Sequence, residues 1–358
     1  MKTLLQEKLG VPENIIQSSR RYYDDLTNEL EKVVKGSNRE EQYYFFIKPE
    51  EPYKIGDFKT SSIKTTVNIT PTNRFDKVDW TQMQVTTPLV LPQGKTSIID
   101  SPSVVINIVA PFDFTKEDIL DWWGESRAEI ISTLSHEFKH LFDEQLKKSE
   151  KISDRSSYIA TRKMMVNPNS ALEYLGHIIY FTHLIESLVR PTEILAYLEE
   201  NKVSKKDFIK FLTDNSTWKK LKELSEFKIE DFKDNVIQTK KLRLDYEVYK
   251  LLGADAALLT DKQKVDILLI NFYYKLVTED LDVFADILKN DNFEWGFEFP
   301  ENKERALDVH FKRISRFKNE PLKYFDYMEK YINTVSTKLL RKISKLYDLL
   351  PNEQKTTE

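Results

Sequence analysis

Residues 130–142 read Ile-Ile-Ser-Thr-Leu-Ser-His-Glu-Phe-Lys-His-Leu-Phe. At about 100° per residue, the rotation of an α-helix, the apolar side chains of this stretch gather in one arc. His136 and His140 lie roughly opposite that arc, one turn apart on the same face. The pattern predicts a helix, within about 125–148, that buries one face in a core and turns two imidazoles toward a polar cleft.

The two histidines have the spacing of a zinc-binding pair. Imidazoles one helical turn apart suit two ligands of one tetrahedral Zn²⁺. Glu137 lies about 100° round the helix from His136, in the general-base position of the H-E-x-x-H motif. Glu129 and Asp143 could orient the second nitrogen of a ligand, or could belong to a solvated face. A surface helix with solvated histidines is the alternative, and the agreement of motif and apolar face favours the metal.

A catalytic zinc site needs a third protein ligand and one open position for water. The chain has no cysteine and only five histidines, so this ligand must be His, Asp or Glu. Glu193, in the segment Pro191–Tyr197 where a helix is expected to begin, is the preferred candidate. Glu186, His183 and His177 remain alternatives. An acidic residue in a first helical turn also favours the helix dipole, which is the plain explanation of Glu193.

Two further side chains are candidates for catalysis. A developing oxyanion needs a hydrogen-bond donor, and His183 and Tyr197 are near Glu193 in sequence. If the helix runs on past Pro191, both lie on the same face as Glu186 and Glu193. Positions in the core or at its rim are the alternative for both side chains.

His136-Glu137-x-x-His140 followed by Glu193-x-x-Ala196 resembles the gluzincin branch of the zincin metallopeptidases. The resemblance covers roughly residues 100–200 and implies a zinc-dependent peptidase with one Zn²⁺, held by the two histidines and Glu193. It also implies a zincin-like core whose small sheet has an edge strand beside the substrate. No H-x-x-G-x-x-H continuation follows His140, which disfavours metzincins. The composition is also similar to uncharacterised phage-encoded zinc peptidases.

The fold class is predicted to be α+β and mostly α, with a small sheet at about 41–110 next to the metal-site helix. Residues 1–40 are expected to be helical, with a long helix from Glu13 to Lys35 after Pro12 and Gly36 at its end. A β-rich run at 43–47, alternation of polar and apolar residues at 62–70, and the stretches 78–87 and 104–109, separated by Pro, Asn and Gly clusters, predict four strands.

The helices that follow are predicted from their capping residues. Thr115 should cap a short helix that Gly124 separates from the metal-site helix. Ser170–Glu173 fits a capping box and should start a helix through about 189, which Pro191 stops or kinks. From residue 203 to about 349 the pattern is almost entirely helical, and Pro321 should open the last long helix.

Four divisions of the chain follow from these patterns. Residues 1–40 form an N-terminal helical segment, and residues 41–200 form a zincin-like catalytic domain with a β part at 41–110 and metal-site helices at 115–200. A C-terminal helical domain follows at 201–350, and a flexible tail at 351–358.

The composition of the chain disfavours two classes of partner, nucleic acids and membranes. A net charge of -4 and a pI near 5.9 give no general attraction to nucleic acid. The N-terminal residues lack the apolar region of a signal peptide, and no run approaches the roughly 20 apolar residues of a membrane span. A cytoplasmic protein with no membrane and no nucleic-acid partner is expected, and a virion location fits a phage-encoded chain.

The expected function is zinc-dependent hydrolysis of a peptide or protein substrate, with Glu137 as general base. The alternative is a catalytically silent or narrow-specificity structural or assembly protein with a zincin fold, of a phage particle for instance. The long helical region, which could bind a protein partner, supports this alternative. A toxin or effector with one protein substrate is a third hypothesis.

Overall fold

The computed structural model describes residues 9–36, 42–55, 58–73, 78–86, 102–146, 152–165, 170–289 and 299–352. The chain forms two compact units, each assembled from separate stretches. Unit 1 contains residues 1–147, 188–215 and 342–358, and unit 2 contains residues 148–187 and 216–341. In the described ranges, no helix is both long and apolar enough to cross a bilayer.

A four-stranded sheet belongs to unit 1, and its strands follow the order β1 (Gln42–Ile47), β4 (Ile63–Pro71), β6 (Ser103–Ala110), β5 (Asp79–Thr86). β4 and β6 run parallel, and the other two pairs are antiparallel. All four strands lie where the sequence predicts them. A hairpin of β2 (Tyr53–Ile55) and β3 (Phe58–Thr60) was not predicted, because strands of three residues are too short to show alternation.

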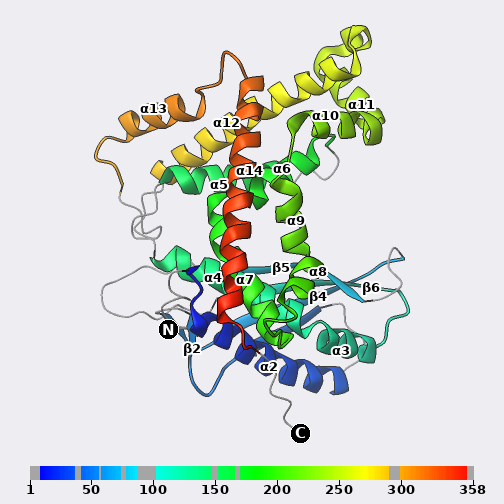
Figure 1. Ribbon diagram of the computed structural model, residues 1–358, viewed down its shortest axis with the longest axis vertical. Helices are drawn as coiled ribbons and strands as arrows, with labels where there is room; N and C mark the ends of the chain where they lie inside the picture. The colour runs from blue at the N-terminus through cyan, green and yellow to red at the C-terminus, as the bar shows by residue number, and fades with distance from the viewer. Residues whose placement is uncertain are drawn as a thin grey trace. The chain divides into compact units, whose positions relative to one another are not determined.

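One face of this sheet is buried, because the strands alternate buried and more exposed side chains. The helices α2 (Glu13–Gly36) and α4 (Arg127–Leu146) contact each other, and both contact strands of unit 1 (Figure 1). β5 is an edge strand of the sheet, and it contacts α4. The α2 prediction is confirmed, although Gly36 belongs to the helix itself.

The helix α3 (Lys116–Glu125) begins as the sequence predicts. The Thr115 hydroxyl accepts from the backbone N–H of Asp118, whose carboxylate accepts in return from the backbone N–H of Thr115 at 2.6 Å. These hydrogen bonds lower the pKa of Asp118. The expected break at Gly124 is wrong by two residues: α3 ends at Glu125 and Ser126 separates it from α4. One glycine inside a helix does not end it.

The remaining helices of unit 1 are α7 (Leu184–Glu200) from residue 188 onward and α8 (Phe208–Asp214). Unit 2 is helical throughout its described residues, and its elements are α5 (Ile152–Met165), α6 (Glu173–Phe181), α9 (Ser216–Leu224), α10 (Ile229–Thr239), α11 (Lys241–Leu252), the 3₁₀ helix η1 (Gly253–Leu258), α12 (Asp261–Lys289), α13 (Lys303–Ile314) and most of α14 (Leu322–Ser344). A second 3₁₀ helix, η3 (Lys345–Leu349), follows in unit 1.

The region between 150 and 200 differs most from its prediction. α5 was not predicted. The capping box at Ser170–Glu173 is wrong: α6 has no side-chain cap, and the Ser170 hydroxyl bonds to Glu247. The expected helix through 189 is also wrong, because the chain breaks at Thr182 and His183 before α7 begins. The helical prediction from 203 to 349 is confirmed for the described residues, 203–289 and 299–349, with Pro321 directly before α14.

Three polar side chains form a network inside unit 2. Asp280 of α12 accepts a hydrogen bond from the hydroxyl of Ser156 and lies 3.0 Å from Nε2 of His310. All three residues are buried, and the ring of Phe284 stacks on the imidazole of His310 at 3.9 Å between centroids. Since Asp280 takes both contacts, this trio joins α5, α12 and α13 as a structural network.

We expect Asp280→Ala to destabilise unit 2 by about 3 kcal/mol, because two buried donors lose their acceptor. Chemical denaturation followed by circular dichroism measures this change. Asp282→Ala, on the exposed face of the same helix, is the matched control and should stay within about 0.5 kcal/mol of the wild type. Equal stability of the two variants would contradict the structural role of the network.

Candidate metal centre

Helix α4 presents its histidines as the sequence predicts. Its apolar face is buried, at Ile130, Ile131, Leu134, Phe138 and Leu141. His136 is itself only 7% exposed, and Glu137 and His140 are half-buried. The histidine face of α4 is therefore covered by other parts of the chain, which a helix with two solvated histidines would not be.

The two imidazoles converge on one point. Nε2 of His136 and Nε2 of His140 lie 3.1 Å apart, and the ring planes meet at 75°. This separation suits an N–H···N hydrogen bond, and it also suits two nitrogens on one ion. Two ligands at about 2.0–2.1 Å from a tetrahedral zinc ion lie about 3.3 Å apart.

Glu193 meets the other nitrogen of His136. Its Oε2 atom is 2.8 Å from Nδ1 of His136, and Arg190 donates to the same oxygen at 2.8 Å. Because a carboxylate only accepts, Nδ1 of His136 must carry the proton, which leaves the lone pair of the neutral ring on Nε2. The Ser132 hydroxyl, one turn before His136, bonds to the backbone oxygen of Glu193 at 2.9 Å and fixes α7 against α4.

A third ligand is available on α7. Ligand atoms of His136, His140 and Glu186 all lie within 4.8 Å of one another. The boundary between the units falls inside α7, between Ser187 and Leu188. Because α7 is one continuous helix, Glu186 is carried by the same element as Glu193, two turns earlier on the same face.

Glu186 is a buried carboxylate with a hydrogen-bond donor. It is 1% exposed, and the Tyr158 hydroxyl donates to its Oε1 atom at 2.9 Å. Burial raises the pKa of Tyr158 well above its usual range, and the charge of Glu186 raises this pKa further. Tyr158 therefore stays protonated and orients the carboxylate, while a buried carboxylate is costly unless a positive charge compensates it.

The arrangement differs from the expectation that Glu193 is the third ligand. That expectation placed Glu193 in the first turn of a helix starting at Pro191, whereas α7 starts at Leu184 and contains Pro191 in its interior. The longer helix brings Glu186 to the imidazole pair and Glu193 to Nδ1 of His136. The alternative of Glu186, left open by the sequence, has the better geometry.

The other candidate side chains lie outside the group of three. Nδ1 of His183 accepts from the backbone N–H of Ile185 at 3.3 Å, at the start of α7. Tyr197 is half-buried one turn after Glu193, and burial raises its pKa, followed by the charges of Glu129 and Asp214.

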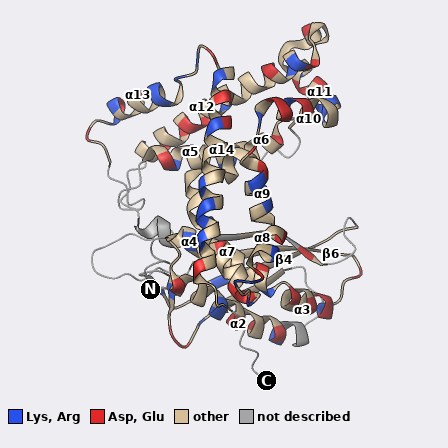
Figure 2. Cartoon of the chain, viewed as in Figure 1, with Lys and Arg blue, Asp and Glu red and all other residues tan. Residues whose placement is uncertain are grey.

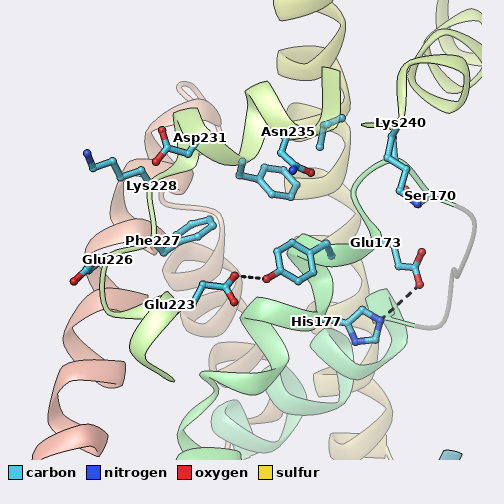
Figure 3. Close-up of a pocket in the computed structure, with 14 residues that line it drawn as sticks. Ser170, Glu173, His177, Glu223, Glu226, Phe227, Lys228, Asp231, Asn235 and Lys240 are labelled. Carbon is cyan, nitrogen blue, oxygen red and sulfur yellow. Dashed lines mark hydrogen bonds and ion pairs between the residues drawn. The ribbon is translucent and has the colours of Figure 1, made fainter. Parts of the chain in front are cut away.

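Three further residues were considered above, His177 as a ligand and Glu129 and Asp143 as orienting partners. His177 lies beside Glu173 at 3.8 Å, on the wall of a separate hollow of about 640 Å³ in unit 2 (Figure 3). Glu129 is exposed, and the side chain of Asp143 lies outside the described residues. The orienting partner of His136 is Glu193, and a carboxylate two turns along a neighbouring helix carries no local sequence signal for that role.

The donor set fits zinc. Two neutral imidazoles and one carboxylate are the protein ligands of many catalytic zinc sites, which keep a fourth position for water. Glu193 on Nδ1 of His136 adds the carboxylate–histidine contact that accompanies such ligands. His136, His140 and Glu186 are therefore the residues that could hold the ion. No known protein family, curated protein or solved structure matches this chain.

Two variants separate the roles of the two α7 carboxylates. Glu193→Gln should weaken zinc binding about 10- to 100-fold, the usual effect of losing a partner of a ligand. Glu186→Gln should weaken it more, because it removes a ligand itself. Competition with a chromogenic zinc chelator measures both affinities.

Glu199→Gln, on the same helix and outside the site, is the control and should bind zinc as the wild type does. A larger loss for Glu193→Gln than for Glu186→Gln would reverse the assignment and make Glu193 the ligand.

Proposed function

We propose that this chain is a zinc-dependent hydrolase of peptide bonds. The observation that carries the proposal is the convergence of His136, His140 and Glu186, whose ligand atoms lie within 4.8 Å of one another. Glu137 follows the first of these histidines on α4 and is half-buried. The two imidazoles, the carboxylate and the adjacent glutamate together form the set that H-E-x-x-H chemistry requires.

Each side chain of the candidate centre has a role in this proposal. A zinc ion, when bound, supplies a Lewis acid that lowers the pKa of water and polarises a carbonyl group. Glu137 takes the proton of the attacking water and returns it to the leaving amine. Glu193 holds the imidazole of His136 with Nε2 toward the ion, and Tyr158 holds the carboxylate of Glu186. His136, Tyr158 and Glu186 are buried and Glu137 and Glu193 are half-buried, which limits the access of competing water.

The sheet supports a peptide as the substrate. β5 is an edge strand and contacts α4, which carries the histidines. On the side away from β6, β5 pairs with no strand among those that the structure describes. An extended peptide can add to such an edge through main-chain hydrogen bonds, which present successive carbonyl groups at defined positions.

The decisive variant is Glu137→Gln. It should keep zinc at the wild-type stoichiometry and lose cleavage by about 100-fold or more, because general-base catalysis contributes about 10²–10⁴-fold. Metal analysis measures the first property. New N-termini in a proteome-derived peptide mixture, identified by mass spectrometry, measure the second. Glu117→Gln, at an exposed position of α3, is the matched control.

The possible results separate the hypotheses. A wild-type protein that carries no zinc, or a Glu137→Gln protein that cleaves as fast as the wild type, would refute the proposal. Zinc without any cleavage in peptides or lysate would favour a structural protein, the alternative supported by the wholly helical described part of unit 2. One cleaved protein in a whole lysate would indicate a narrow effector-like specificity.

A further inference from the structure

We propose that unit 2 binds a small anion that carries an apolar chain, of the class of alkyl phosphates and alkyl carboxylates. The site is a hollow of about 490 Å³ whose lining residues all belong to unit 2. They come from the end of α5, the start of α6, α11 and α12. None of the candidate zinc ligands lines this hollow, so the inference does not depend on the proposed hydrolysis.

Two helices each turn one face to the hollow. The lining residues include Arg243, Tyr246, Glu247 and Lys250 of α11 and Leu268, Asn271, Phe272 and Lys275 of α12. In both helices the spacing is three, four and seven residues, which places each set on one side of its helix. Figure 2 shows basic and acidic positions interspersed along α11 and α12. The charge of the hollow therefore depends on which positions face it.

The floor of the hollow is apolar. Leu172, Leu268 and Phe272 line it and are buried, and Met164 beside them is half-buried. Leu251 also lines the hollow, although 45% of its surface is exposed. An alkyl chain that lies on this floor loses its contact with water and covers side chains of the protein, and both changes favour binding.

The two acidic side chains of the lining are already engaged. Oε1 of Glu247 accepts from the backbone N–H of Ala171 at 2.9 Å, and Oε2 accepts from the Ser170 hydroxyl at 3.2 Å. Glu173 lies 3.8 Å from Nε2 of His177, one turn further along α6. Both carboxylates thus have partners other than the basic side chains of the hollow.

The basic side chains of the lining outnumber the acids and are mostly uncompensated. They are Lys163, Arg243, Lys250 and Lys275. Lys163 pairs with Glu279 at 2.9 Å, and the other three form no ion pair with any residue that the structure describes. Residues 166–169, which join two parts of the lining in sequence, are Val-Asn-Pro-Asn and carry no charged side chain. A hollow with this charge attracts anions.

Two of these cations meet at one aromatic ring. The guanidinium carbon of Arg243 is 5.8 Å and Nζ of Lys250 is 4.5 Å from the centre of the Tyr246 ring. The hydrogen bond and the charge of Lys250 lower the pKa of Tyr246. Asn271, half-buried on the facing helix, has no side-chain hydrogen bond within the described residues. Ammonium, guanidinium and amide groups all donate to phosphate and carboxylate oxygens.

Binding of four defined probes to the full-length protein tests the inference. The probes are octyl phosphate, ethyl phosphate, inorganic phosphate and uncharged octyl glucoside, each below its micellar concentration, and isothermal titration calorimetry measures their affinities. We expect octyl phosphate to bind at one site, at least about tenfold more tightly than ethyl phosphate, because its longer chain covers the apolar floor. It should exceed octyl glucoside by about tenfold as well, and added salt should reduce that difference.

Two pairs of substitutions locate the site. Lys250→Gln/Lys275→Gln, which neutralises two exposed lysines of the lining, should weaken octyl phosphate binding about tenfold. Lys219→Gln/Lys222→Gln, at exposed positions of α9 outside the hollow, is the matched control and should bind as the wild type does. Circular dichroism checks that both variants fold.

The failures are equally distinct. No binding of octyl phosphate, equal affinities for octyl phosphate and octyl glucoside, or an affinity that Lys250→Gln/Lys275→Gln leaves unchanged would overturn the site. Inorganic or ethyl phosphate that binds as tightly as octyl phosphate would indicate a site for free anions and would overturn the role of the apolar floor. Octyl phosphate binding by a protein that holds no zinc would support the site and count only against the proposed hydrolysis.

Discussion

The contact between Nδ1 of His136 and the carboxylate of Glu193 is the interaction on which the candidate centre depends. At 2.8 Å it assigns the proton of the neutral imidazole to Nδ1 and leaves Nε2 as a lone pair facing His140. The same carboxylate accepts from Arg190, and the backbone oxygen of Glu193 accepts from Ser132. The side chain and the backbone of one residue thus fix both the tautomer of a ligand and the position of α7 against α4.

The electrostatics of the centre follow from this arrangement. Glu186 is almost fully buried, and its carboxylate accepts a hydrogen bond from Tyr158, which offsets part of the cost of burying its charge. A cation held by the two imidazoles and this carboxylate would offset more of that cost, so the donor set fits a metal ion.

The parts of the fold that could be read from the sequence are those whose residues repeat with a local period. The apolar arc of α4, the alternation in β4 and the strand-forming residue types of β1, β5 and β6 predicted these elements within a few residues. α7 was misjudged because Pro191 removes a backbone N–H and usually ends a helix. Burial of Val189, Ile194 and Leu198 in α7 supplies enough packing to keep the proline inside.

The part of the candidate site that could be predicted from the sequence is likewise the part that is local in the chain. His136, Glu137 and His140 lie within one turn of one helix, so their relation is local and the motif describes it. Glu186 and Glu193 reach the histidines from a second helix. Which carboxylate meets which nitrogen depends on the rotation and height of α7 relative to α4, and neither quantity is encoded in the spacing of residues. The sequence could list the carboxylates, but their ranking as ligands depends on that packing.

The single helix α7 therefore determines how far apart several side chains of the candidate site lie. Glu186, Glu193 and Tyr197 follow one another at intervals of seven and four residues on α7, which places all three on one face about 10 Å and then about 6 Å apart along the axis. The first approaches the imidazole pair, the second orients His136, and the third is half-buried one turn further along the helix. Because consecutive turns of a helix are joined by backbone hydrogen bonds, Glu186 and Glu193 keep a fixed spacing of about 10 Å along the axis. That spacing lets one carboxylate approach the imidazole pair while the other contacts Nδ1 of His136.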